Sequence, residues 1–353
     1  MRFGYWMPIF GGWLRNVPDE GMTVAWPYIR DLAVDSERHG FDLTLIAELN
    51  LNDIKGHRAP ALDCWTLAPA VAAVTSRIEL MLAVRPNYHP PAATAKAIST
   101  LDTIAPGRVS LNVVSSWWRD EAAQYGAPFD VHDARYARTE EWLQVLDRLL
   151  REQSVTHDGP IYQLAATELE PKPEHVPTVY MGGESPRAKE VITEHGDAYV
   201  MHGDAPDVIA AKIQQMRDLR KAADRPPLTF GVAGYVICRD TEAEAQAELA
   251  RILDVRSSPE AYASYRDFIE GSQLESHISL EEYSVSNRGL RAGLVGTPDQ
   301  ITARIREYED AGVDLLLLQL SPQHEEMARF GRQVIAPWRH AGRAGDRTGK
   351  SSA

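Results

Sequence analysis

The sequence predicts an α/β protein built as a closed (β/α)₈ barrel, the TIM-barrel architecture, with insertion segments. Short β-rich runs alternate with longer amphipathic stretches, and eight such strand-helix units can be counted along the chain. The strands are almost continuously apolar, which is typical of a parallel sheet covered by helices. Eight units favour a closed barrel over an open sheet, and no strand is followed by GxGxxG and a helix.

The units follow one another at regular spacing, and each pairs a run rich in β-branched, leucine or aromatic residues with a stretch of helical periodicity. In order, they are RFGYWM with 25–39, LTLIA with 62–75, IELMLAV with 91–104, RVSLNVV with 119–151, PTVYM with 186–194, DAYVM with 206–223, LTFGVAGYVIC with 241–255, and DLLLLQL with 323–335.

Two segments interrupt this rhythm and are predicted to be insertions, at about 154–176 and 257–296. Long loops in compact domains tend to be functional. Residues 1–340 are therefore expected to form a single domain, since a barrel can exceed the usual domain size. The last segment, 341–353, is expected to be a flexible tail.

Composition limits the possible functions. Apolar residues make up 44% of the 353 residues and charged residues 25%, as in soluble globular proteins. No apolar run reaches the ~20 residues of a membrane-spanning helix, and the N-terminus lacks signal-peptide features, so a cytoplasmic protein is expected. A formal charge of −13, with dispersed Lys and Arg, disfavours nucleic-acid partners. The two cysteines, Cys64 and Cys238, are expected to be buried rather than disulfide-bonded.

The segment TVYMGGESPRAKE has the form of an anion-binding turn. A strand ends at Met181, two glycines follow, and Ser185 precedes a proline at the start of a helix. Glycines let the backbone approach a ligand, and the free N–H groups of a helix N-terminus favour a phosphate. An ordinary serine-capped turn is the alternative. The location at the C-terminal face of a barrel, where phosphate-bearing cofactors commonly dock, favours the phosphate site.

The helix that begins near residue 132 supplies a second candidate. Asp133 is expected to be its N-cap, which places Tyr136 in the first turn with its hydroxyl in reach of a ligand phosphate. Packing of this tyrosine over the barrel core is the alternative. The eleven histidines form neither HxH nor HExxH, so no metal site is predicted. No GxSxG elbow or activated cysteine indicates hydrolysis.

Aromatic and amide-bearing side chains recur where the strands end. They are Trp6, Phe10, Trp13, Asn50, Asn87, Tyr88, Trp117 and Trp118. Each one alone is most simply a core residue, but their convergence on one face suggests a large, flat, mostly apolar pocket. A phosphate site beside such a pocket describes a site for flavin mononucleotide (FMN).

Six segments in a characteristic order carry a family resemblance: YWMP at 5–8, AVTSRIELMLAVRP at 73–86, AKAISTLDTIAPGRVSLNVVSSWWRDE at 95–121, HDARYARTEEW at 132–142, VYMGGES at 179–185 and LVGTPDQITARIREYEDAGVDLLLLQLSP at 294–322. In this order the chain resembles the bacterial luciferase-like flavin-dependent monooxygenases, and within them the alkanesulfonate and dimethyl sulfone monooxygenases. The resemblance covers nearly the whole chain.

The resemblance implies a two-component enzyme that takes reduced FMN from a separate NAD(P)H-dependent flavin reductase. With O₂, it inserts one oxygen atom into a small organic substrate, often with C–S cleavage. The implied cofactor-binding residues are Asn112, Ser115, Tyr136, Met181, Gly182, Gly183, Glu184 and Ser185. The predicted catalytic residues are Trp6, Trp117, Arg288 and Arg291. A homodimer or homotetramer is also expected, with helices 62–75 and 91–104 as a candidate interface.

Several positions depart from the family pattern. Ser116 stands where similar enzymes commonly have glycine, so the local backbone is expected to differ. Alkanesulfonate monooxygenases have cationic or polar side chains where this chain has Phe10, Ala233, Tyr235 and Ser321. Because a buried anion needs paired donors, these changes favour a neutral substrate, such as a sulfone, over a sulfonate.

Two hypotheses concern the mouth of the barrel. Trp117 and Trp118 are expected to keep the pocket dry, so that oxygen reaches the substrate rather than leaving as H₂O₂. One of the two indoles is expected to pack between the barrel and the next helix. The loop that carries Arg288 and Arg291 is expected to order over bound flavin, with a solvated surface loop as the alternative.

Other functions stay open at this point. The substrate could be an alkanesulfonate or a nitrogen heterocycle rather than a sulfone. A deazaflavin-dependent dehydrogenase of the same superfamily would transfer hydride and need no oxygen. A flavin-binding barrel without catalytic activity is a third possibility.

Overall fold

A closed barrel of eight parallel strands forms the centre of the computed structural model, which describes residues 1–253, 279 and 282–341. Around the barrel the strands are ordered β1-β12-β9-β8-β7-β4-β3-β2. Their bounds are β1 Arg2–Trp6, β2 Leu43–Ile46, β3 Glu79–Val84, β4 Val109–Val113, β7 Thr178–Met181, β8 Ala198–Met201, β9 Thr229–Tyr235 and β12 Leu315–Gln319. The predicted (β/α)₈ architecture is confirmed.

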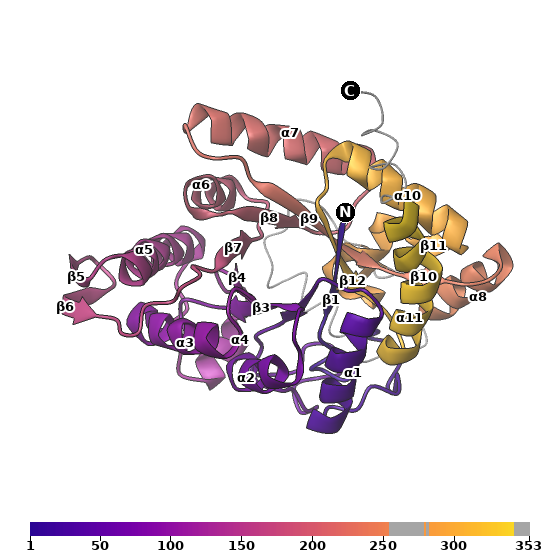
Figure 1. Ribbon diagram of the computed structural model, residues 1–353, viewed down its shortest axis with the longest axis horizontal. Helices are drawn as coiled ribbons and strands as arrows, with labels where there is room; N and C mark the ends of the chain where they lie inside the picture. The colour runs from indigo at the N-terminus through magenta and orange to yellow at the C-terminus, as the bar shows by residue number, and fades with distance from the viewer. Residues whose placement is uncertain (254–278, 280–281, 342–353) are drawn as a thin grey trace.

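Helices surround the strands on the outside of the barrel (Figure 1). They are α1 Trp26–Arg38, α2 Cys64–Val74, α3 Pro91–Ile104, α4 Arg119–Gln124, α5 His132–Arg151, α6 Pro186–His195, α7 Pro206–Ala222, α8 Glu242–Leu253, α10 Pro298–Ala311 and α11 Gln323–Phe330, which continues into a π-helical turn, Gly331–Ile335. Most of these helices bury an apolar stripe, which explains the helical periodicity of the sequence, whereas the short helix α4 buries only Glu121 and Ala122.

Two predicted elements are divided in the structure. The helix expected over 119–151 is split into α4 and α5 by a loop that contains Gly126 at φ +67°. The strand expected over LTFGVAGYVIC ends its barrel pairing at Tyr235. The next two residues form a separate strand, β10 (Ile237–Cys238), which pairs with β11 (Val295–Gly296). Periodicity alone predicts neither break.

The first insertion contains an antiparallel hairpin of β5 (Ser154–Asp158) and β6 (Gln163–Glu168), which extends from the barrel beside α5 (Figure 1). The described part of the second insertion consists of two 3₁₀ helices, η2 (Glu282–Ser284) and η3 (Ser286–Ala292), followed by β11. Residues 254–278 and 280–281 of this insertion region, and the predicted tail from residue 342, lie outside the described residues.

One interaction across the barrel identifies the inward-facing side chains. Strands β1 and β7 lie on opposite sides of the barrel, yet Arg2 Nη1 donates to Tyr180 Oη at 3.2 Å. Both side chains therefore point inward. Because side chains alternate along a strand, Trp6 also points inward, and Met181 points outward toward the helices. Asn112 pairs in register with Tyr180 and shares its inward orientation.

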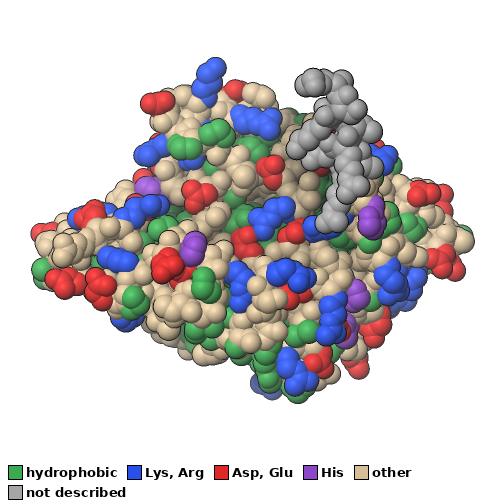
Figure 2. Space-filling model, in the orientation of Figure 1, with side chains coloured by type: hydrophobic (Ala, Val, Ile, Leu, Met, Phe, Trp, Pro, Cys, Tyr) green, Lys and Arg blue, Asp and Glu red, His purple; other side chains and the backbone are tan. Residues whose placement is uncertain are grey.

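The two cysteines are free and buried, as predicted. Basic and acidic side chains intermingle on the face that Figure 2 shows, as the dispersal of Lys and Arg along the sequence suggests. None of the helices in the described ranges is long and apolar enough to cross a membrane.

Candidate active site

The turn between β7 and α6 has the local structure that the sequence predicts. Ser185 is the N-cap of α6, and its Oγ accepts from the amide of Ala188 at 3.2 Å, while Pro186 occupies the first turn. Gly183 has φ +141°, and a Cβ added to it would lie 2.7 Å from Ala188 Cβ and 3.1 Å from Tyr136 Oη. Only glycine fits this position, because Ala188 and Tyr136 pack closely against its Cα.

Tyr136 reaches this turn from the neighbouring helix α5. Its hydroxyl lies beside Gly183 and hydrogen-bonds Ser185. Burial raises the pKa of Tyr136, although Ser185 and Arg135 oppose the shift, so the phenol stays protonated and can donate. The predicted cap was wrong: α5 begins at His132 with Val131 as its N-cap, and Asp133 lies inside the helix without capping it.

These residues fit a phosphate group. Backbone amides of the turn before α6, the Ser185 hydroxyl and the Tyr136 phenol are possible donors, and donors beside a helix N-terminus suit an anion. The carbonyl of Gly183 is held by Tyr199, whose hydroxyl donates to it at 3.0 Å. The turn is therefore fixed before a ligand arrives. Met181 points away from this site and can contact a ligand only through its backbone.

The Glu184 side chain makes ion pairs with protein cations. Arg288 Nη2 lies 2.5 Å from Glu184 Oε1, and Lys212 Nζ lies 3.4 Å from the same oxygen and 3.5 Å from Asp204. Burial by itself raises the pKa of Glu184. The hydrogen bond and charge of Arg288, with His202 and Lys212, outweigh it and hold this pKa below its ordinary value. The backbone of Glu184, rather than its carboxylate, is available to a phosphate.

This ion pair predicts a pH dependence of stability. A carboxyl whose pKa is lowered by folding contributes stability above its unfolded pKa, near 4.5, and loses it as pH falls through the lower folded value. We therefore expect Glu184→Gln to lower the urea midpoint at neutral pH, with a gap to wild type that closes below about pH 4. The exposed Glu190 provides the control, Glu190→Gln. A gap that is the same at both pH values contradicts this role.

The 3₁₀ helix η3 packs on the strand ends of β8 and β9. A Cβ on Gly203 would lie 2.6 Å from Arg288 O, and one on Gly289 would lie 2.9 Å from Tyr235 N. Arg288 is buried and its backbone is left-handed at φ +51°. Arg291 makes an ion pair with Glu282. The two predicted catalytic arginines therefore lie at the mouth of the barrel, each beside a carboxylate.

Two predicted site residues, Trp6 on β1 and Asn112 on β4, face the barrel interior. Trp6 is half-buried at the end of β1, and its Nε1 is shielded from solvent without a hydrogen-bond partner. Asn112 is half-buried on β4. Ser115, just after β4, accepts at Oγ from Thr139 Oγ1 at 2.9 Å. A buried N–H without a partner costs free energy, so Trp6 suits a ligand that accepts a hydrogen bond from it.

The paired tryptophans that follow β4 stack on each other. The rings of Trp117 and Trp118 are 5.4 Å apart and nearly parallel, at 6°, and His57 meets Trp118 edge-on at 4.9 Å. Trp117 remains 37% exposed at the rim of the barrel. The structure thus pairs the two indoles, whereas the sequence suggested that one of them packs between the barrel and the next helix.

A buried ion-pair cluster lies below this rim, at the ends of β2 and β3. Arg85 pairs with Glu121 of α4 through both terminal nitrogens, and its amide donates to Glu48 at 2.7 Å. Glu121 also accepts from the amide of Asn50 at 2.5 Å. The side chains of Arg85 and Glu121 are 1% and 0% exposed. The cluster connects the loop after β2, the end of β3 and α4.

A second buried carboxylate, Glu20, organises the loop after β1. It accepts from the amides of Trp13 and Leu14, both at 2.8 Å, and pairs with Lys55 at 2.6 Å. Ser321, which follows β12, donates to Glu20 at 2.5 Å. The sequence did not indicate Glu20, because an acid in a Pro- and Gly-containing loop resembles an ordinary turn residue.

His202, directly after β8, is another residue that sequence analysis passed over, and its charge is one of the causes that hold the pKa of Glu184 low. Its position after a strand was the available signal. Ser116 adopts φ +55°, the left-handed conformation that glycine favours, so the backbone expected to differ keeps a glycine-like shape. In the residues that the structure describes, no group of three His, Cys, Asp or Glu could hold a metal ion.

The barrel, the glycine-containing turn before α6 and Trp6 facing the interior fit a site for a cofactor that carries a phosphate. Residues 1–315 match the family model described as luciferase-like monooxygenase. The chain belongs to this family, which confirms the predicted family and the assignment as a monooxygenase.

Two curated relatives are similar over most of their length. One, from Pseudomonas fluorescens (strain Pf0-1), is named FMNH₂-dependent dimethylsulfone monooxygenase and is 31% identical over 345 residues, 95% of this chain and 93% of the relative. One of the same name from Pseudomonas putida is 31% identical over 347 residues, 95% of this chain and 94% of the relative. Both names agree with the predicted cofactor.

Among solved structures, DmoA from Hyphomicrobium sulfonivorans superposes with a TM-score of 0.81 at 18% identity, covering 97% of this chain and 88% of that chain. At this identity the similarity concerns the fold alone. It supports the barrel assignment and says nothing of the substrate.

Proposed function

We propose that this protein is a two-component monooxygenase that uses reduced FMN and O₂ to oxidise a small neutral organosulfur compound, of the sulfone class, with cleavage of a C–S bond. The names of the two curated relatives support this substrate class. The observation that carries the cofactor assignment is the β7–α6 turn, where Gly183, the Ser185 cap of α6 and the Tyr136 hydroxyl come together at a helix N-terminus.

The proposed FMN would be held at its phosphate by the backbone of residues 182–185, with the hydroxyls of Ser185 and Tyr136. Asn112, Ser115 and Trp6 would face its ring system from the barrel interior. When bound, reduced FMN supplies the two electrons that oxygen activation requires. The protein contributes binding, orientation and the exclusion of water.

A neutral substrate is favoured by the polar groups around Glu20. Burial raises the pKa of Tyr235 above its ordinary range, although a hydrogen bond to Ser321 opposes the shift, and Ser321 itself donates to Glu20. The Ser321 hydroxyl is thus committed to the Glu20 carboxylate, and the Tyr235 hydroxyl to Ser321, rather than available to an anionic ligand. A sulfonate would need unpaired donors at this place, so a sulfone is the better match.

The proposed reaction needs no oxidant other than O₂. One oxygen atom of O₂ enters a C–H bond next to the sulfonyl group and gives an α-hydroxy sulfone. Its C–S bond then breaks, and the products are an aldehyde and a sulfinate. The other oxygen atom leaves as water, with the two electrons of the reduced flavin and two protons.

One reconstitution experiment tests this function. The protein is supplied with a flavin reductase, NADH, FMN and O₂, and sulfones, sulfonates and nitrogen heterocycles are screened for oxygenated products by mass spectrometry. Aldehyde and sulfinate formed from a sulfone support the proposal. Two results contradict the proposal: oxygenated products that form from sulfonates alone, or products that form only when a deazaflavin is supplied.

The stacked tryptophans give a second test. If the pair shields the reacting oxygen from water, Trp117→Ala and Trp118→Ala should each raise the fraction of reduced flavin oxidised to H₂O₂ rather than to product. The readout is the ratio of H₂O₂ to product, because a purely structural effect lowers both together. Unchanged ratios in both variants refute the shielding role.

The proposal includes a separate flavin reductase as partner and a homodimer or homotetramer. The exposed side chains of Val74, at the end of α2, and Ile104, at the end of α3, are apolar and could lie in a subunit interface. Analytical ultracentrifugation tests the assembly, and substitution of both residues by Glu should shift it toward the monomer.

A further inference from the structure

The barrel interior beside β8 is built from small residues. Ala198 pairs in register with the inward-facing Tyr180, so Ala198 and, by alternation, Val200 point into the barrel. On one side, Val200 pairs with Gly231 of β9. On the other side lies Gly182, just after β7, where an added Cβ would be 3.1 Å from Val200 O. Val200 therefore has a glycine on each neighbouring strand.

These small residues leave the interior open to solvent next to Val200. Barrels of this kind normally fill their interior with layers of bulky side chains. The strands opposite β8 do so: Leu45 and Met81, which share the register row of the inward-facing Trp6, are 1% and 0% exposed. Val200 is only half-buried and Gly182 is exposed. We call the space lined by Gly182, Val200 and Gly231 the β8 well.

The proposed flavin position leaves the β8 well uncovered. Strand β7 lies between β4 and β8 in the barrel. With the phosphate at residues 182–185 and the ring system facing Asn112, Ser115 and Trp6, the flavin extends from β7 toward β4 and β1. The β8 well lies on the other side of β7, toward β9. A molecule in the well would therefore lie beside the ring system, as a substrate must.

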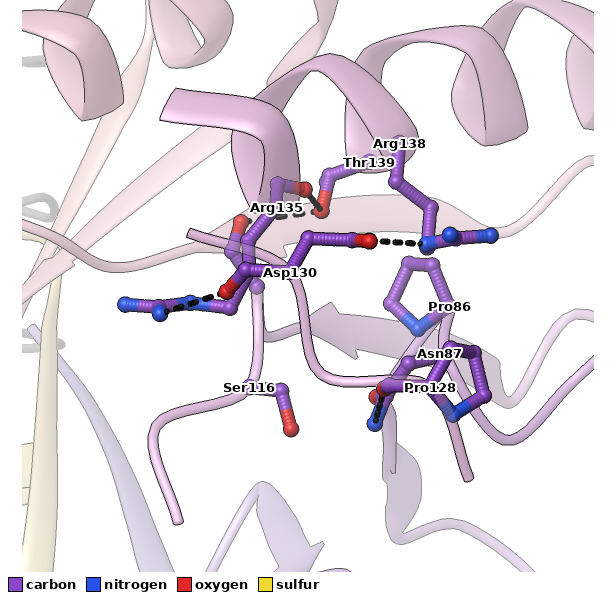
Figure 3. A pocket seen from close by; sticks show the side chains of 9 residues that line it. Pro86, Asn87, Ser116, Pro128, Asp130, Arg135, Arg138 and Thr139 are labelled. Atoms are coloured by element: carbon purple, nitrogen blue, oxygen red, sulfur yellow. Dashed lines mark hydrogen bonds and ion pairs between the residues drawn. The ribbon is translucent and has the colours of Figure 1, made fainter. Parts of the chain in front are cut away.

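The cavity in Figure 3 is a different space. It lies between the loops after β3 and β4 and the start of α5, and Pro86, Pro128 and Thr139 are among its lining residues. It has room for about one water molecule. The ion pair of Arg138 with Asp130, at 2.7 Å, forms part of its wall. Its size and its charged wall do not suit a neutral organic substrate.

We propose that the β8 well binds an alkyl group of the sulfone, and that Val200 is the specificity-determining residue that limits the size of this group. The walls are apolar, because Ala233 follows Gly231 on the inward face of β9. A Cβ on Gly231 would lie 3.3 Å from Val200 Cγ2, so one methyl group of Val200 covers this glycine. A β-branched side chain has few rotamers and fixes the depth of the well. This inference rests on the proposed function.

The test measures kcat/KM for dimethyl sulfone and for di-n-propyl sulfone in wild type, Val200→Ala and Val200→Phe. Alanine deepens the well by two methyl groups, so the ratio of di-n-propyl to dimethyl sulfone should rise about 10-fold. Phenylalanine fills the well, so KM for dimethyl sulfone should rise about 10-fold. The dissociation constant for FMN should stay as in wild type in both variants, which also shows that they fold.

The matched control is Val179→Ala on β7. Val179 is half-buried like Val200, but it precedes the inward-facing Tyr180 and therefore points outward. Its selectivity ratio should equal that of wild type.

Three outcomes would overturn the inference. If wild type oxidises sulfones and Val200→Ala has the same ratio as Val179→Ala, the role of Val200 is refuted while the proposed function stands. If Val200→Phe weakens FMN binding as much as it raises KM, the flavin rather than the substrate occupies the β8 well, and the inference fails alone. If wild type neither binds nor oxidises any sulfone, both the inference and the proposed function fail.

Discussion

Gly183→Ala should weaken the binding of FMN by about 100-fold, because the change forces the turn before α6 to move and would misalign the hydrogen bonds proposed to hold the phosphate. The added Cβ would lie 2.7 Å from Ala188 Cβ, inside van der Waals contact, and Ala188 belongs to the helix that supplies the amides. The backbone at φ +141° also disfavours any side chain. Dissociation constants come from anaerobic titrations followed by flavin absorbance.

The control for backbone strain is Gly126→Ala, because Gly126 has φ +67° and a Cβ there would meet nothing within 4 Å. Its affinity for FMN should equal that of wild type. Circular dichroism confirms that both variants are folded. If Gly183→Ala folds and binds FMN as tightly as Gly126→Ala, the turn does not hold the cofactor.

Arg85→Met should destabilise the protein by about 3–5 kcal/mol, since it leaves the Glu121 carboxylate buried without its cation. The side chain of Glu121 is 0% exposed, and water cannot replace the lost partner. The pair also connects α4 to the loop after β2 through the amide of Asn50. The measurement is the urea-induced unfolding midpoint, followed by circular dichroism.

An exposed ion pair of the same type provides the comparison. Arg151 and Asp147 on α5 are 59% and 58% exposed, and Arg151→Met should cost less than about 1 kcal/mol, as is usual for surface pairs. Equal losses in the two variants would mean that burial does not govern the Arg85 pair. A stable Arg85→Met protein would also show that the mouth of the barrel does not depend on it.

Much of the fold could be predicted because strands and helices leave local signals. The apolar run DLLLLQL became β12 and the amphipathic stretch 91–104 became α3 with the predicted bounds. The breaks at Gly126 and Tyr235 left weaker signals. The residues of β10 are as apolar as those of β9, and only pairing with β11, distant in sequence, separates the two strands.

The candidate site, like the fold, was only partly predictable from the sequence. The Ser185 cap and the approach of Tyr136 followed from a local motif and a family resemblance. The partners of Glu20 and the backbone conformation of Ser116 did not. Glu20 acquires its partners, Lys55 and Ser321, from 35 and 301 positions away. The left-handed backbone of Ser116 is visible only in three dimensions.

The most direct measurement compares reduced FMN with reduced riboflavin, which lacks only the phosphate, in titrations under nitrogen. If the phosphate accepts several charge-assisted hydrogen bonds at residues 182–185, as proposed, reduced FMN should bind saturably and reduced riboflavin at least about 100-fold more weakly. Equal affinities for the two flavins, or no saturable signal with FMN, would contradict the binding of the FMN phosphate at the start of α6.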